Sequence, residues 1–440
     1  MKNILDPLKQ FNKPDSILAI TTYPNPRDGI LGKKEFSAVG WHSEKTLTHL
    51  QKHAPVIVLA EKREGPTVRK ITDDMVIARV WKKGSPFSLF KILKVALSLS
   101  KVRHVYAQFE FNVFGGILPN LLLLLILAVL RLTGRSITFE LHQVITDIAL
   151  LQKHINITNP LLQRFFNLGL NLFYRILGVV ANDIIVFEEE LKNRLSSFVP
   201  TKKIQVLSLA VDSKKHPSMK RARSLLSLPQ DEFIILVFGF INGYKGIDWI
   251  INALKDHSDK KIRLLIAGGE NPYLKDQPHY QKFYQGIITE AKKYPHVTLS
   301  GFVPDDQIQN YFAAASVVVM PYEVFMAASG PFSLALSYGK PLLLSSVLSD
   351  YAQSKDFKQS LNEAGILNDD IFFKLNTKDL VSHIERAQTS SAYLEQLTMF
   401  TNSLAGLRGS EVVTKNLFQI ITTPHLFKPV LLEETSLSIN

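Results

Sequence analysis

Apolar and polar positions follow one another along the chain in a pattern that predicts a parallel α/β fold. Short apolar runs rich in β-branched residues recur, and stretches with apolar residues at helical spacing separate most of them. The strands expected in the first half cover residues 17–22, 55–60, 76–81, 104–109, 136–141, 183–187 and 203–209. Those expected in the second half cover residues 233–239, 263–268, 297–301, 316–321 and 341–346. Strands buried between helices on both faces are typical of parallel sheets.

The domain organisation follows from the length of the chain and from one polar stretch. A chain of 440 residues is too long for one ordinary hydrophobic core. Residues 211–232 are polar and basic and contain two prolines, so we interpret them as a linker. We therefore expect two Rossmann-like, doubly wound domains, residues 1–210 and 233–395, that face each other across a cleft. The helical segment 396–440 could pack back on either domain, the N-terminal one included.

The first candidate site is the stretch FGFINGYKGIDWI, residues 238–250. In a doubly wound sheet, ligands bind beyond the carboxyl ends of the strands. Here Asn242 and Gly243 form a turn after an apolar strand, and Lys245 and Gly246 stand where the next helix begins. The first turn of a helix favours an anion, and a lysine adds a full positive charge. The motif indicates a phosphate site, although a surface lysine would give the same letters.

A second helix start occurs in MPYEVFMAASGPFSLALSYGK, residues 320–340. The preceding strand ends at Pro321, and Ser329-Gly330-Pro331 opens a helix with proline in its first turn. Main-chain groups of Ser329 and Gly330 are placed to donate to phosphate oxygens. Glu323 is the acid nearest in sequence, and it could accept hydrogen bonds from sugar hydroxyls or remain a solvated loop residue.

Composition and charge restrict the partners. The chain has no cysteine, which excludes disulfides and thiolate metal sites, and no acidic cluster is typical of a metal centre, so we expect neither metal nor cofactor. The net charge is +12, with basic residues concentrated in 62–103 and 202–223. Such surfaces attract phosphorylated molecules or anionic lipid. We expect no nucleic-acid partner, because the sequence contains none of the usual nucleic-acid-binding motifs.

Two helical stretches raise the question of a membrane. The apolar run within 115–135 is too short to span a bilayer, which indicates a buried or interfacial helix. In 85–103, the residues Phe87, Phe90, Leu93 and Leu97 form one stripe and the lysines lie largely off it. That helix could lie on an anionic membrane, or its stripe could face the core. Because the first residues lack the shape of a signal peptide, we expect a cytoplasmic protein, with peripheral attachment to the inner face of the membrane left open.

Taken in order, the motifs resemble those of the GT-B glycosyltransferases, in particular the retaining family-4 type. The resemblance is strongest in 233–346 and rests there on FGFINGYKGIDWIINAL, LLIAGG, VTLSGFVPDDQIQNYFAAASVVVMPY and SGPFSLALSYGKP. In the first half it is looser and rests on ITTYPNPRDGILGKKE, SITFELHQV and ANDIIVFEEELKNRL.

This resemblance implies a donor site for a nucleotide-diphosphate sugar in the C-terminal domain and a glycan or lipid-linked acceptor. It implies that Lys245 grips the diphosphate and that His142 projects toward the reacting sugar, with Glu323 as a third catalytic candidate. It also implies transfer with retention and without metal. The implied donor-binding residues are Gly29, Gly239, Asn242, Lys245, Gly301, Phe302, Val303, Ser329 and Gly330.

The sequence departs from the family at two charged positions. An arginine usually precedes the lysine by five or three residues, where this chain has Phe240 and Asn242. Two glutamates usually stand eight residues apart, where it has Met326 and Leu334, and Glu323 replaces the first only in part. The departures favour a second interpretation, a non-catalytic member of the fold that binds a nucleotide sugar or a partner enzyme. A third is an epimerase on the same two domains, which would need acids and histidines that converge on the sugar.

Overall fold

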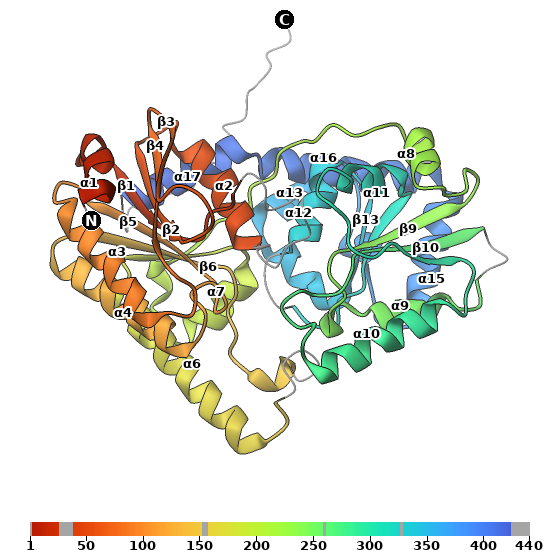
Figure 1. Ribbon diagram of the computed structural model, residues 1–440. Coiled ribbons are helices and arrows are strands. Elements are labelled where there is room, and N and C mark those ends of the chain that lie inside the picture. The colour runs from red at the N-terminus through yellow and green to blue at the C-terminus, as the bar shows by residue number, and fades with distance from the viewer. Residues whose placement is uncertain (1, 26–37, 152–156, 258–260, 326–328, 424–440) are drawn as a thin grey trace, which may run out of the picture.

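The chain forms two α/β domains side by side, each with a twisted sheet between layers of helices (Figure 1). The computed structural model describes residues 2–25, 38–151, 157–257, 261–325 and 329–423. Every expected strand is present, with ends shifted by a few residues at most, and the expected fold class of two parallel-sheet domains is confirmed.

The N-terminal sheet has the strand order β3-β4-β2-β1-β5-β6-β7-β8. All neighbouring strands run parallel except β3, which is antiparallel to β4 and was not expected from the sequence. The strands are β1 (Ile17–Ile20), β2 (Val56–Glu61), β3 (Val68–Thr72), β4 (Met75–Trp81), β5 (His104–Phe109), β6 (Ser136–Leu141), β7 (Asp183–Val186) and β8 (Ile204–Val206).

Alternate residues of these strands enter two separate hydrophobic clusters, one on each face of the sheet. Leu18 and Ile20 pack with the helices α3 (Pro86–Ser98), α4 (Ile117–Leu132) and α6 (Pro160–Val180). Ile17 and Ala19 pack with α2 (Ala38–Leu50) and α17 (Ser410–Thr422). The last described helix of the chain therefore covers the first domain, as Figure 1 shows.

The C-terminal sheet is parallel throughout, with the order β11-β10-β9-β12-β13-β14. Helices α9, α10 and α15 lie on one side of it, and α11, α12, α13 and α16 lie on the other (Figure 1). Its strands are β9 (Phe233–Phe238), β10 (Ile262–Ala267), β11 (Val297–Leu299), β12 (Val317–Met320), β13 (Leu342–Ser345) and β14 (Phe372–Phe373). Its helices are α9 (Ile247–Leu254), α10 (Pro278–Ala291), α11 (Ile308–Ala314), α12 (Gly330–Ser337), α13 (Lys355–Ala364), α14 (Asn368–Ile371), α15 (Thr377–Thr389) and α16 (Ser391–Leu407).

The remaining elements are short, and one of them lies in the segment expected to be a linker. Residues 211–232 were interpreted as linker, but they contain α8 (Met219–Leu225), which packs against α11. The buried Arg223 ties α8 down by donating to the carbonyl of Ala314 and the hydroxyl of Ser316. The other short elements are α1 (Lys2–Leu8), η1 (Lys9–Phe11), η2 (Ile148–Leu151), α7 (Glu189–Ser196), η3 (Thr201–Lys203), η4 (Gly243–Lys245) and η6 (Ser346–Gln353).

The described part of the chain crosses between the domains twice, and the two crossings are bonded to each other. The amide of Val211 donates to the carbonyl of Arg408 at 2.8 Å. The guanidinium of Arg408 is 2% exposed and bonds Glu188 of the N-terminal domain at 2.9 Å and Asp356 of the C-terminal domain at 2.7 Å. Burial by itself lowers the pKa of Arg408, but the two carboxylates outweigh it and raise that pKa above its ordinary value.

Replacing this arginine tests how much the crossing contributes to stability. Arg408→Met should lower the free energy of unfolding by about 3–5 kcal/mol, because it leaves Glu188 and Asp356 without their buried cation. Lys70→Met is the control, because the Lys70–Asp73 pair is exposed and its loss should leave the unfolding midpoint unchanged. Urea unfolding of both variants measures the difference, and equal midpoints would contradict this role for Arg408.

Candidate functional site

Lys245 lies in a tight turn between β9 and α9 that depends on two glycines with positive φ. A Cβ at Gly239 (φ +104°) would lie 2.6 Å from the Lys245 Nζ atom. A Cβ at Gly246 (φ +64°) would lie 2.0 Å from the carbonyl oxygen of Pro321. Larger residues would clash at both positions, so the glycines let β9, the lysine and the end of β12 approach one another.

The ammonium group of Lys245 is buried, and no carboxylate of the described residues opposes its charge. The side chain is 5% exposed, and its Nζ atom lies 5.9 Å from the ring centroid of Tyr322. No salt bridge joins Lys245 to a carboxylate among the residues that the structure describes. Burial lowers the pKa of Lys245 to about 8. A cation held in this way is stabilised by any anion that reaches it.

The start of α12 meets Lys245 from the other side. The helix begins at Gly330, so Pro331 is its second residue, and a Cβ at Gly239 would lie 3.2 Å from the Pro331 Cγ atom. The buried hydroxyl of Ser329 accepts from the amide of Phe332 at 3.3 Å and caps the helix. The main-chain N–H groups in the first turn of a helix are suited to bind an anion.

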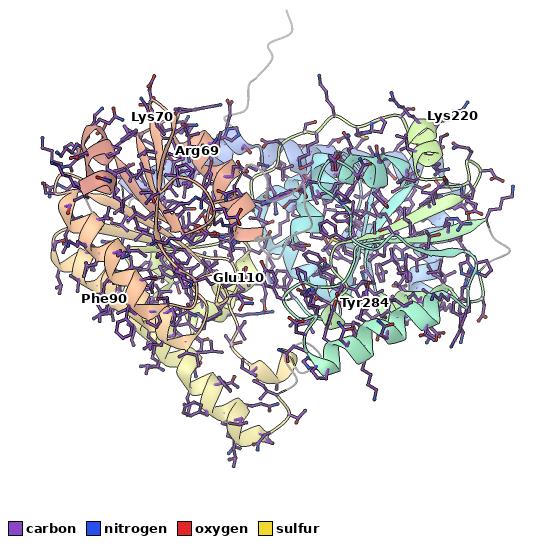
Figure 2. All side chains as sticks on the ribbon, in the orientation of Figure 1. Arg69, Lys70, Phe90, Glu110, Lys220 and Tyr284 are labelled. Atoms are coloured by element: carbon purple, nitrogen blue, oxygen red, sulfur yellow. The ribbon has the colours of Figure 1, made fainter. Side chains whose placement is uncertain are left out.

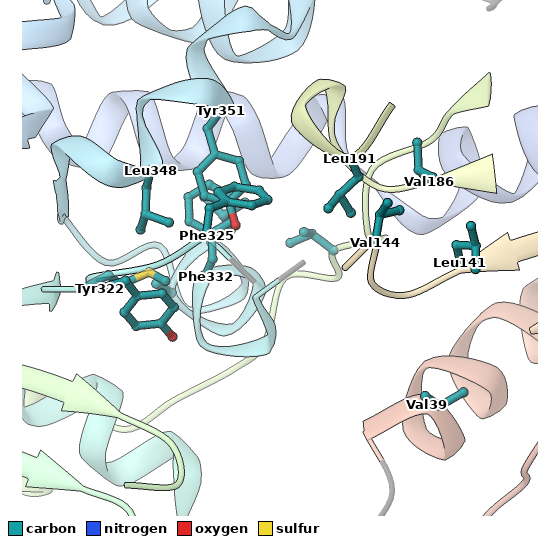
Figure 3. Packing of buried hydrophobic residues seen from close by; sticks show 14 of the residues in the cluster. Val39, Leu141, Val144, Val186, Leu191, Tyr322, Phe325, Phe332, Leu348 and Tyr351 are labelled. Atoms are coloured by element: carbon teal, nitrogen blue, oxygen red, sulfur yellow. The ribbon is translucent and has the colours of Figure 1, made fainter. Parts of the chain in front are cut away.

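Aromatic packing fixes the direction of this helix start. The ring of Phe332 stacks on that of Tyr351 with centroids 4.6 Å apart, and Phe325 packs beside Tyr351 (Figure 3). Glu323, in the loop before the helix, donates its amide to the carbonyl of Tyr244 at 2.8 Å. The turn that carries Lys245 and the loop that carries Glu323 are therefore bonded together.

The other expected donor-binding residues divide between the rim of the site and the interior. A Cβ at Gly301 (φ +71°) would meet no atom within 4 Å, and Phe302 is 43% exposed and stacks on Phe240. Val303 and Asn242 are buried instead. The Oδ1 atom of Asn242 accepts from Asn271 at 2.8 Å, which assigns this side chain to the structure of the turn.

In the N-terminal domain, His142 continues the ladder of β6 and belongs to a buried charge network. Its amide donates to the carbonyl of Phe109 at 2.9 Å. Its Nε2 atom lies 3.0 Å from the Oε1 atom of Glu140, and the Nε2 atom of His42 lies 2.9 Å from the same oxygen. His42, on α2, was not expected from the sequence because it lies about 100 residues from its partners along the chain.

Further hydrogen bonds hold Glu140 in place. Tyr106 donates its hydroxyl to Glu140 at 2.6 Å, and Gln108 donates to Glu140 at 3.1 Å. Burial by itself raises the pKa of Glu140, but the two histidines outweigh it and lower that pKa below the usual range. Burial also lowers the pKa of His142. The network is thus an ionised carboxylate surrounded by donors.

The same three side chains are the one group among the described residues that could hold a metal ion. The ligand atoms of His42, Glu140 and His142 lie within 4.8 Å of one another. In the structure, however, both Nε2 atoms point to the carboxylate oxygen as hydrogen-bond donors. An ion would have to replace both bonds, so the observed geometry is that of a positioned histidine.

Glu110 is a further candidate site residue that was not expected from the sequence. It directly follows β5, so the rule that singled out the other sites, polar residues just after strands, could have found it. Burial raises the pKa of Glu110, and the positive charge of Lys83 opposes that shift. Figure 2 shows Glu110 on the side of the N-terminal domain that faces the C-terminal domain. Its charge also helps to raise the pKa of Tyr244, next to Lys245, to about 12, chiefly through burial of that ring.

Contacts between the domains confirm that the carboxyl ends of the two sheets face each other. Arg194 donates to the carbonyl of Val144, after β6, at 3.5 Å and to that of Phe325, after β12, at 3.0 Å. Lys83, after β4, lies 5.3 Å from the ring centroid of Tyr273, after β10. Loops that follow strands of one domain thus touch loops that follow strands of the other.

Of three further positions singled out in the sequence, the structure describes one. Gly29 and Met326 lie outside the residues that the structure describes. Leu334, at the position of the missing glutamate, lies on α12 and packs partly buried against the core. A cavity of about 730 Å³ lies elsewhere, between residues 211–216, the end of α12 and the start of α17, and none of the candidate site residues lines it.

Comparison with known proteins agrees with the fold. Residues 218–387 match the family model described as "Glycosyl transferases group 1". The fold is that of sucrose-phosphate synthase from Thermosynechococcus elongatus, with a TM-score of 0.68 and 16% identity over 92% of this chain and 98% of that one. Anabaena HepE in complex with UDP and glucose gives a TM-score of 0.61 and 14% identity over 91% of this chain and 98% of that one. The fold is therefore of the GT-B type, as the sequence resemblance implied.

A curated relative matches over a shorter stretch. A "GDP-mannose:glycolipid 4-beta-D-mannosyltransferase" of Xanthomonas campestris pv. campestris is 28% identical over 109 residues, which are 25% of this chain. The matched stretch spans 29% of that relative, less than a third of its length.

The lowered pKa of Lys245 predicts how anion binding depends on pH. Below about pH 8 the ammonium is charged, and above it the free protein loses this charge. The affinity for a nucleoside diphosphate should then fall by up to about tenfold per pH unit above about pH 8. Lys245→Arg stays charged and should bind with nearly constant affinity over the same range. Calorimetric titration from about pH 7 to about pH 9.5 distinguishes the two, and a flat profile for the unmodified protein would contradict the assignment.

Proposed function

We propose that this chain of GT-B fold is a glycosyltransferase that moves a sugar from a nucleotide-diphosphate donor to an acceptor. One observation carries the proposal: Lys245, without a carboxylate partner in the described structure, converges with the start of α12 beside Gly239. A diphosphate bound there would receive a full positive charge and main-chain donors at once.

The mechanism follows from where negative charge develops. As the nucleoside diphosphate departs, charge builds on its oxygens, and fixed donors that strengthen at that moment lower the barrier. Lys245 and the main chain of Ser329 and Gly330 would supply this stabilisation, so we propose that no metal ion is needed. Glu323, bonded through its amide to the same turn, would orient the donor.

His142 would act on the sugar from the opposite domain. Its lowered pKa keeps the imidazole neutral near pH 7, which avoids a positive charge beside an oxocarbenium-like transition state. Glu140 and His42 would be positioning residues, because they hold the ring of His142 and each other. The rim residues Gly301 and Phe302 would flank the nucleotide base, and Val303 would support them from the core.

We propose a glycan or lipid-linked acceptor, met by a cytoplasmic protein at the inner face of a membrane. The name of the Xanthomonas relative specifies a glycolipid acceptor. No helix in the described part of the chain is both long and apolar enough to cross a bilayer. Contact with a membrane would therefore be peripheral.

Two stereochemical outcomes are compatible with these groups. We propose retention, in which the leaving phosphate helps to deprotonate the acceptor on the same face of the sugar. Inversion is the second candidate, and Glu110 favours it because a partly buried carboxylate with a raised pKa suits a general base. A non-catalytic binding protein is the alternative favoured by Asn242 and Leu334, which replace charged residues of the family.

Two substitutions in the same part of the site, Lys245→Ala and Gly239→Ala, test turnover and donor binding. Thermal-shift measurements with nucleoside diphosphates and their sugars, with and without divalent metal, should identify one stabilising donor in both conditions. Lys245→Ala should abolish turnover with that donor while the protein stays folded. Gly239→Ala should weaken donor binding by about tenfold, or about 1.4 kcal/mol, because its Cβ displaces the ammonium.

Gly286→Ala is the matched control, because Gly286 lies in α10 and a Cβ there would meet no atom within 4 Å. It should bind the donor as the unmodified protein does. No shift with any nucleotide would reject the donor site, whereas a shift without turnover would favour the non-catalytic alternative.

The product distinguishes retention from inversion. With retention, nuclear magnetic resonance should show the donor's anomeric configuration in the product, and Glu110→Gln should keep measurable turnover. With inversion, the configuration should change and Glu110→Gln should lose turnover by at least about a hundredfold, as expected for a general base. Binding of the donor should be unaffected by this substitution in both cases.

A further inference from the structure

The long helix α6 presents an apolar stripe to solvent. Its exposed apolar residues recur every three or four positions, which places them on one face. They are Leu161 (73% exposed), Phe165 (69%), Leu168 (68%), Leu172 (59%), Ile176 (37%) and Val179 (74%). The opposite face, with Phe173, Tyr174 and Leu177, packs into the core. One face of the helix therefore packs into the core of its own domain, and a second apolar face stays exposed to solvent.

Two neighbouring helices extend this surface. Helix α4 packs against α6, and α3 packs against α4, and Figure 1 shows the three side by side on the outer face of the N-terminal domain. Their exposed apolar residues include Phe87, Phe90, Leu97, Ile117, Leu118, Leu121, Leu125 and Leu132. Three residues of the α3 stripe expected from the sequence, Phe87, Phe90 and Leu97, thus face solvent, whereas the fourth, Leu93, packs partly buried against the core. Leu89, Ile92, Val95 and Ala96 face the core.

The charges on the three helices all have one sign. They carry Lys91, Lys94, Arg131, Arg164 and Arg175 and no acidic residue. Arg164 and Arg175 are exposed on α6, within the apolar stripe or at its edges. An extended apolar surface with basic residues and no acid is complementary to the headgroups and acyl chains of an anionic bilayer.

We propose that α3, α4 and α6 together form a face that inserts into the interfacial layer of an anionic membrane. This deepens the proposed function, on which it rests only for the lipid-linked acceptor. It also differs from an electrostatic contact by residues 85–103 alone, because most of the exposed apolar side chains lie on α4 and α6. Attachment should accordingly survive high salt in part.

The same helix is bonded to the segment beside the site. Tyr174 on α6 accepts from the amide of Ile145 at 2.9 Å and donates to its carbonyl at 3.2 Å. Ile145 lies three residues after His142. A membrane that holds α6 would therefore also keep the loop next to His142 at a fixed distance from the bilayer surface. A lipid-linked acceptor would enter the site beside this loop.

Because the chain has no cysteine, one introduced cysteine can report insertion. Leu168→Cys, labelled with a polarity-sensitive fluorophore, should show a blue shift with vesicles of phosphatidylcholine and phosphatidylglycerol. Leu367→Cys is the matched control, because Leu367 is 75% exposed in the C-terminal domain and should show no shift. A shift at both positions or at neither would overturn the proposal.

Flotation with the same vesicles tests how much the apolar and the basic side chains each contribute to membrane binding. Leu168→Glu with Leu172→Glu should weaken binding at least about tenfold, whereas Leu367→Glu with Met399→Glu should leave it unchanged. Arg164→Gln and Arg175→Gln should each weaken binding to anionic vesicles about fivefold and leave binding to neutral vesicles unchanged. All positions are exposed, so each variant should stay folded, which circular dichroism would check.

Three outcomes would overturn the proposed face: no flotation at low salt, complete release by high salt, or equal flotation of the glutamate variants. Light scattering identifies the competing occupant, because dimers that these variants dissociate would assign the face to a second copy of the chain. Thermal shift by the nucleotide donor is measured in parallel. Retained donor binding without flotation rejects the membrane face alone, and flotation without donor binding rejects the transferase alone.

Discussion

One buried cation holds the two domains in the relation on which the site depends. Arg408 bonds Glu188 in the first domain and Asp356 in the second, and its carbonyl is bonded to Val211 in the other crossing. Breaking either contact would leave a charge without its partner in a low-dielectric interior. The ion pairs therefore restrict the relative orientation of the domains more than a flexible linker would. Helix α17 then continues into the first domain and completes the layer beside α2.

Within this frame the two halves of the site treat charge in opposite ways. Lys245 is buried beside glycines and an aromatic ring. Burial raises the free energy of its charged form, and a bound anion offsets that cost. Glu140 is buried as well, but two histidines, a tyrosine and a glutamine already satisfy it. The first arrangement suits binding of a charged leaving group, and the second suits precise orientation of one imidazole.

Helix α6, on the outer surface of the first domain, connects the proposed membrane face with the loop that follows His142. Helix α6 uses one face to build the core and the hydroxyl of Tyr174 to hold the loop after His142. Its other face is apolar and carries no acid. If a membrane covers that face, the same helix sets both the depth of the protein in the interface and the position of the loop after His142.

The sequence by itself determined what depends on neighbours along the chain. The strands, the glycine turn around Lys245 and the helix start at Ser329 were predictable because periodicity, turn residues and caps act over a few positions. The tertiary structure alone decided what depends on distant residues. It brought His42 to Glu140, engaged Asn242 with Asn271, and set Arg408 between the domains. It also decided that the apolar stripe of α6 faces solvent, because helical periodicity marks an apolar face without stating what that face will meet.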